Sequence, residues 1–184
     1  MIAFALAVVL AAAPVTYHMH DIVGHSMADD FNTAITGVEA ACADDATKCA
    51  FEIRIDSPGG DVLAMVRMAA RLEVAAAHGV KTACVVEGVA LSAAGLIFVT
   101  CPVRHMPPSG QLMLHSVVSL TGGTQEDVAR GLKQFARVND LVVDMIVRGS
   151  RGKLSREDVA ARVGGRNEWW LSREEALAAG LTDD

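Results

Sequence analysis

The sequence predicts an α/β protein with a mostly parallel sheet, and two patterns lead to this class. Runs rich in β-branched residues alternate with runs that carry apolar residues at helical spacing, from Val15 to His115. Strands and helices that alternate at this length form right-handed βαβ crossovers, which make neighbouring strands parallel. No repeat or low-complexity linker divides the 184 residues. We therefore expect one domain over 15–184, preceded by an apolar segment over 1–14.

The first predicted elements follow from apolar spacing and cap residues. A strand is expected over Val15–Val23, and the next helix is expected to begin at Ser26, a residue type favoured as an N-cap. A second strand over Ala50–Ile55 ends at the turn Ser57–Gly60. An amphipathic helix follows from Asp61 and stops near His78-Gly79, where glycine permits the left-handed turn that ends many helices.

The middle of the chain repeats the alternation. A third strand covers Lys81–Glu87, and after a turn at Gly88 an Ala-rich helix opens at Ser92. A short strand and the turn Pro107-Pro108 then lead to the strand Gln111–Leu114, which delivers His115. Beyond it one long apolar-striped helix is expected after residue 124, and two shorter helices begin at the capping patterns over 155–158 and 172–175.

Composition limits the classes of function. The formal net charge of −6 argues against a general nucleic-acid binder, which would carry a basic face. The sequence has no GxxxxGK[ST] loop, so any ATP-dependent step would need another protein. Hydrophobic residues make up 52% of the chain, which is ample for a core and favours further burial in an oligomer.

The apolar N-terminal segment leaves two interpretations open. Met1–Ala13 is shorter than the ~20 residues of a membrane-spanning helix, and its Ala-rich end is typical of a secretory signal. The lack of Lys or Arg near Met1 and the presence of Pro14 oppose a signal. We expect a cytoplasmic protein, with a periplasmic or secreted protein as the alternative.

The cysteines and the first histidines are not expected to bind a metal. Cys42 and Cys49 flank an Asp-rich loop and would form a disulfide in an exported protein, whereas the remaining two cysteines, Cys84 and Cys101, are expected in the core. His18 and His20 alternate on one strand, a pattern more typical of a solvated strand face than of a ligand pair. No cofactor and no metal are expected.

Three segments supply the parts of a serine hydrolase. Gly59 and Gly60 offer backbone N–H groups at a helix start, which suit an oxyanion. Ser92 lies among small residues at a strand-to-helix turn, which places the Ala93 N–H beside the same oxyanion. His115 at a strand end would act as the base. Each segment also has a structural interpretation as a turn, an N-cap or a strand-end residue, so it is their order that favours acyl transfer.

A third group should orient the imidazole. Glu168, just before the two tryptophans, is the first candidate, and Asn167 is the second because an amide oxygen also orients histidine. A solvated loop carboxylate is the alternative interpretation of Glu168.

These segments resemble those of the ClpP family of serine peptidases, within the ClpP/crotonase fold. The resemblance covers about Val15 to Asp183. Ser57–Gly60 matches the family's SPGG turn, and Gly88–Gly95 resembles its nucleophile segment G-x-A-A-S-M-G-A, with departures that include Leu91 and Ala94. The M-I-H and E-E-A-L-x-x-G-L-x-D segments of the family are similar to 113–115 and 174–183.

The resemblance implies stacked ββα (βαβ) units followed by a long handle helix, through which subunits pair into rings. It implies that Ser92 is the nucleophile, His115 the base and Glu168 the third member, where the family has aspartate. The oxyanion hole would be formed by Gly60 and Ala93. Substrate would lie against Gly59, Asp61, Val62, Ser116 and Val117, with the loop 117–123 as an added strand partner.

The expected function is a serine endopeptidase that hydrolyses peptide bonds of unfolded proteins or peptides through an acyl-enzyme at Ser92. A homo-oligomeric ring and a separate AAA+ unfoldase are the implied partners. Two alternatives remain: a crotonase-type acyl-CoA enzyme, for which the sequence offers no clear basic site for CoA phosphates, and a non-catalytic ClpP-like ring subunit. A Ser/Lys enzyme is less favoured because no lysine has a setting comparable to that of His115.

Overall fold

The computed structural model describes residues 13–118 and 122–184. The apolar N-terminal segment therefore lies almost wholly outside the described residues, as does part of the loop 117–123. Among the helices in the described part of the chain, none combines the length and the apolar character needed to cross a bilayer.

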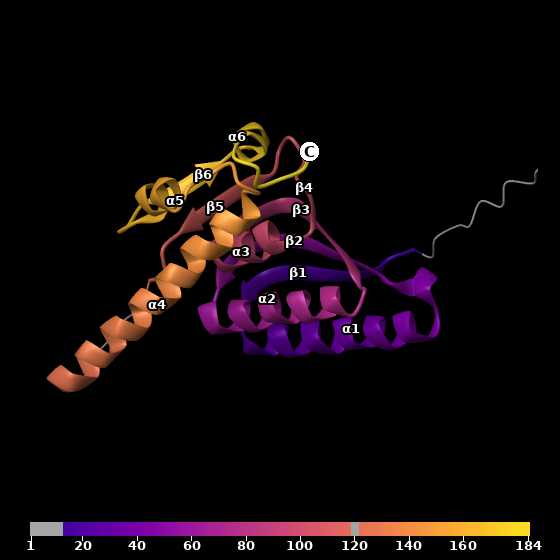
Figure 1. Cartoon of the computed structure of the whole chain (residues 1–184), viewed down its shortest axis with the longest axis horizontal. Coiled ribbons are helices and arrows are strands. Elements are labelled where there is room, and N and C mark those ends of the chain that lie inside the picture. The colour runs from indigo at the N-terminus through magenta and orange to yellow at the C-terminus, as the bar shows by residue number, and fades with distance from the viewer. Residues whose placement is uncertain (1–12, 119–121) are drawn as a thin grey trace, which may run out of the picture.

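A six-stranded sheet forms the centre of the molecule, in the order β1-β2-β3-β5-β6, with β4 paired to β3 (Figure 1). All strand pairs are parallel except β5–β6, which is antiparallel. The predicted α/β class with a mostly parallel sheet is thus confirmed. The strands are β1 (Val15–Val23), β2 (Ala50–Gly60), β3 (Lys81–Leu91), β4 (Val103–His105), β5 (Gln111–His115) and β6 (Glu168–Leu171).

The helices form two groups around the sheet. α1 and α2 lie side by side along one edge of the molecule, whereas α4 extends away from the body as a long arm (Figure 1). The bounds are α1 (His25–Asp44), the 3-10 helix η1 (Ala46–Lys48), α2 (Val62–Ala77), α3 (Ala93–Thr100), α4 (Gln125–Gly149), α5 (Arg156–Val163) and α6 (Arg173–Ala178).

Two strands are longer than the sequence predicts. β2 continues through Ser57–Gly60, which pairs with β1 and β3 beyond irregularities in the register, so this segment is the end of a strand and not a free turn. β3 passes Gly88 and reaches Leu91, because its last residues pair with β5. In both cases hydrogen bonds from distant strands override the local preference of Pro and Gly for turns.

The predicted helix starts are partly confirmed. Capping boxes open α5 at Ser155 and α6 at Ser172, and Thr124 forms a third one before α4. Ser26, in contrast, is not an N-cap: α1 begins one residue earlier, at His25, and its cap position is Gly24, which has no side chain to bond. Only Gly24 separates the end of β1 from the first residue of α1, so the helix begins directly after the strand.

The core lies between the sheet and the helices and includes both central cysteines. Cys84 on β3 and Cys101 after α3 are buried, as predicted, and they also form a disulfide that the sequence analysis did not predict. Cys42 and Cys49 form a second disulfide across the Asp-rich loop, with a Cα–Cα distance of 4.6 Å.

Candidate active site

Ser92 occupies a strained elbow between β3 and α3. Its φ of 54° and ψ of −119° lie where residues other than glycine are rare, a conformation that costs on the order of 1–3 kcal/mol. The Ser92 N–H donates to the Met113 carbonyl of β5 at 2.7 Å, which ties the elbow to the next strand. Although Ser92 stands at the N-cap position, its hydroxyl makes no capping hydrogen bond, so the N-cap interpretation does not account for it.

His115 approaches this hydroxyl from the end of β5. Its Nε2 atom lies 2.7 Å from Ser92 Oγ. β3 and β5 are parallel neighbours, so their carboxyl ends meet at one edge of the sheet and place both side chains there. This separation is within the hydrogen-bond reach that a nucleophile and its general base require.

Backbone amides surround the elbow. Ala93 is the first residue of α3, so its N–H has no partner within the helix and lies at the positive end of the helix dipole. At the end of β2, Gly59 passes so close that a Cβ atom built on it would lie 2.5 Å from the Leu91 carbonyl oxygen and 2.8 Å from Ser92 Cβ. Only glycine permits this approach, which brings Gly60 to the wall of the cleft.

A cleft of about 460 Å³ opens over the elbow. It is lined by eight of the sequence-predicted site residues: Gly60, Asp61, Val62, Ser92, Ala93, His115, Ser116 and Val117. Val118, in the loop predicted to flank the substrate, also lines it, whereas sequence analysis missed two apolar lining residues, Leu63 and Leu96. Leu63 directly follows the predicted Asp61-Val62 pair and is half-exposed, so its place in the first turn of α2 is the signal that could have identified it.

Asp61 and Ser116 have structural bonds within this cleft. The Asp61 carboxylate accepts a hydrogen bond from the Ala64 N–H and caps α2. The backbone N–H of Asp61 donates to the Val23 carbonyl. The Ser116 hydroxyl donates to the Gly165 carbonyl at 2.7 Å. Both residues therefore hold the walls of the cleft in addition to lining it.

Glu168 lies opposite His115 but is not bonded to it. The antiparallel register pairs the two residues directly, and such pairs have Cβ atoms ~4.5–5.5 Å apart on one face of a sheet. The exposed Glu168 carboxylate accepts from the Trp170 Nε1–H at 3.0 Å, and within residues 13–118 and 122–184 no hydrogen bond joins it to His115. Asn167, the second candidate, precedes β6 and is exposed.

The fold and the site together define a class: an α/β protein with a hydrolase-like serine–histidine site. The serine lies on a strand-to-helix elbow, the histidine comes from the adjacent parallel strand, and backbone amides at the helix start are open. The chain belongs to the Clp protease family, whose profile matches residues 21–184. The sequence-based resemblance to the ClpP family and its fold is thereby confirmed.

The fold is similar to that of a solved structure. A mutant of ClpP1 from Listeria monocytogenes matches with a TM-score of 0.76 and 19% sequence identity, covering 91% of this chain and 88% of that chain. At this identity the likeness concerns the fold. The comparison with curated proteins finds no match.

Proposed function

We propose that this Clp protease family member is a serine endopeptidase that cleaves peptides and unfolded proteins through an acyl-enzyme on Ser92. The observation that carries the proposal is the 2.7 Å contact between Ser92 Oγ and His115 Nε2, at a helix N-terminus inside a cleft. The strained backbone of Ser92 supports it, because a plain structural serine has no need of that conformation.

The proposed mechanism begins with His115 Nε2 accepting the Ser92 hydroxyl proton as Oγ attacks the peptide carbonyl. The oxyanion of the tetrahedral intermediate lies against the N–H groups of Gly60 and Ala93, where one lost donor costs ~100- to 1000-fold in rate. His115 then donates its proton to the leaving amine, and water hydrolyses the acyl-enzyme by the reverse transfer.

Glu168 would hold the imidazolium during these steps. Its position directly opposite His115 supports it over Asn167, since residues that face each other across an antiparallel pair project from the same side of the sheet. The carboxylate would exchange its bond to Trp170 Nε1 for one to His115 Nδ1, a rotamer change that its exposure permits.

The assembly is the second part of the proposal. α4 is the handle through which two copies would pair, since its first half carries apolar side chains that one chain leaves uncovered, with Leu132 56% exposed. A homo-oligomeric ring with a separate AAA+ unfoldase in the cytoplasm completes the proposal. Extended substrate would pair with the chain that follows His115, beside the half-exposed Leu63 and the exposed Val118.

A fluorophosphonate probe tests the chemistry. The folded protein should be labelled at Ser92 and should hydrolyse a fluorogenic peptide, while Ser92→Ala and His115→Ala should abolish both. Ser26→Ala is the matched control, because Ser26 is exposed at the start of α1 and outside the cleft. Folded, assembled protein whose labelling is unaffected by Ser92→Ala would refute the proposed nucleophile.

A further inference from the structure

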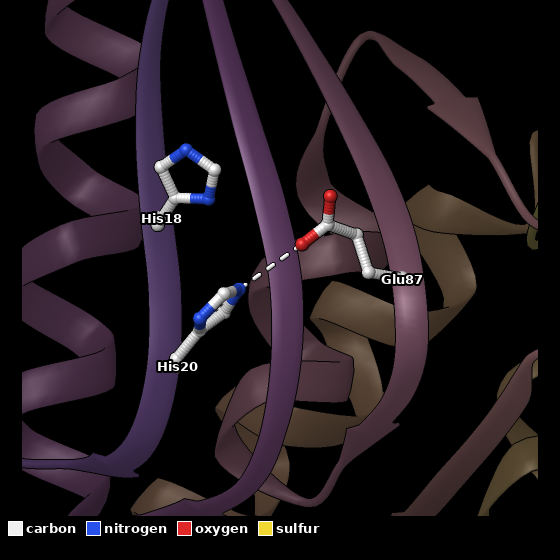
Figure 2. A group of neighbouring side chains, drawn as sticks. All are labelled: His18, His20 and Glu87. Carbon is white, nitrogen blue, oxygen red and sulfur yellow. Dashed lines mark hydrogen bonds and ion pairs between the residues drawn. The ribbon is translucent and has the colours of Figure 1, made fainter.

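A second cluster of reactive side chains lies away from the cleft, on the open face of the sheet. His18 and His20 alternate on β1, while the residue between them, Met19, is fully buried. Both imidazoles therefore project from the exposed face. Figure 2 shows them on this face, with Glu87 reaching from β3 on the far side of β2.

The three side chains are close enough to share one ion. One ligand atom from each lies within 4.8 Å of the others, and His20 Nε2 is 3.0 Å from Glu87 Oε2. Around a tetrahedral Zn²⁺ with bonds of about 2.1 Å, ligand atoms lie about 3.4 Å apart. Small rotations of three exposed side chains bridge that difference.

The charges around the cluster favour a cation. β2 runs between the ligands, and its outward residues Glu52, Arg54 and Asp56 alternate with the buried Ile53 and Ile55. Together with Glu87 they place three carboxylates and one guanidinium on this face, a net excess of negative charge beside two imidazoles.

Arg54 orients the carboxylate without blocking it. Its Nη1 donates to Glu87 Oε1 at 3.0 Å and its Nε donates to Glu52 Oε1 at 2.7 Å, whereas Glu87 Oε2 faces His20. A metal-ligating carboxylate whose other oxygen is hydrogen-bonded is the usual outer-shell arrangement.

We propose that His18, His20 and Glu87 form a surface site for a divalent transition-metal cation of the zinc type. Two imidazoles and a carboxylate are ligands that suit Zn²⁺, and the exposure of the cluster leaves room for a water as the fourth ligand. The ion replaces the His20–Glu87 hydrogen bond, and the imidazoles bind as neutral ligands, releasing any Nε2 proton to the other ring nitrogen or to solvent.

This proposal departs from the sequence-based expectation of a solvated strand face and no metal. The alternation of His18 and His20 was visible in the sequence, but Glu87 lies 67 residues beyond His20. Only the parallel register of β1, β2 and β3 brings that carboxylate across β2 to the histidines.

The test uses Zn²⁺ alone with the full chain in isothermal titration calorimetry at pH 7.5. The wild type is expected to bind one Zn²⁺ per chain, and His18→Ala, His20→Ala and Glu87→Gln should each weaken binding by about tenfold or more. His78→Ala is the matched control, since His78 pairs with Glu39 at 3.0 Å as His20 pairs with Glu87.

A thermal scan of each variant without metal separates ligand loss from misfolding. Zn²⁺ should raise the unfolding midpoint of the wild type and of His78→Ala but not that of the His18→Ala/His20→Ala double variant. Saturable binding that the double variant retains at wild-type affinity, or no saturable binding by the wild type, overturns the proposal. Both readouts are independent of peptidase activity.

Discussion

Substitution of Gly59 by alanine isolates the packing that shapes the Ser92 elbow. Gly59 has φ of +91°, and a Cβ atom there would meet the Leu91 carbonyl, Ser92 Cβ and the Ala93 nitrogen, all within 2.9 Å. Gly79, after α2, has nearly the same φ of +88°, but no atom of the residues that the structure describes lies within 4 Å of its Cβ position. The two glycines thus share the backbone cost of alanine and differ in the steric cost.

The magnitudes follow from this comparison. The left-handed backbone costs a residue with a Cβ about 1–2 kcal/mol, which is the whole effect expected for Gly79→Ala. Gly59→Ala adds an overpacking cost of about 1–3 kcal/mol, because the contacted atoms are mostly backbone. The expected loss of about 2–5 kcal/mol is a large share of the ~5–15 kcal/mol that stabilises a typical domain.

Two measurements check this reasoning. Urea unfolding of both variants gives the two free energies, and the rate of fluorophosphonate labelling reports the geometry at Ser92. A displacement of the elbow by about 1 Å is expected to slow labelling by Gly59→Ala about 100-fold, while Gly79→Ala labels at the wild-type rate. Equal destabilisation of the two variants, or normal labelling by Gly59→Ala, would show that the close approach of β2 does not shape the elbow.

Three further predictions concern other parts of the molecule. Glu168→Gln should slow peptide hydrolysis about 10- to 100-fold while Asn167→Ala has little effect, and the reverse ranking would assign the third role to Asn167. Hydrogen bonds from Arg71 hold the pKa of Glu39 below its ordinary value of 4.5, so the ionised pair stabilises the fold above that pH and this contribution is lost as the pH falls through the lowered pKa. Urea unfolding should therefore find Glu39→Gln about 1 kcal/mol less stable at pH 7, with a difference that shrinks as the pH falls below 4.5; a constant difference would contradict this. Leu132→Asp on α4 should dissociate the proposed oligomer in sedimentation velocity, and an unchanged sedimentation coefficient would place the interface elsewhere.

The candidate site shows which features local sequence patterns can predict. Glycines before a helix, a serine among alanines and a histidine after an apolar strand are visible along the chain, because each role depends on residue type and on a nearby strand or helix end. The bonding of Glu168 was not predictable: whether its carboxylate binds Trp170 or His115 depends on side-chain rotamers at an exposed strand pair. The N-cap of α1 was predicted wrongly for a similar reason, since the path of β1 and not Ser26 sets where that helix begins.

The sequence by itself determined the α/β class, the order of strands and helices and the residue types at the elbow, because hydrophobic periodicity, capping boxes and glycines act over a few neighbouring residues. Tertiary structure alone decided the extension of β2 and β3 to the cleft, the 2.7 Å approach of His115 to Ser92, and the position of Glu87 beside two histidines. These features depend on strand register, which backbone hydrogen bonds fix between segments far apart in the chain, and no local pattern of residues encodes that distance.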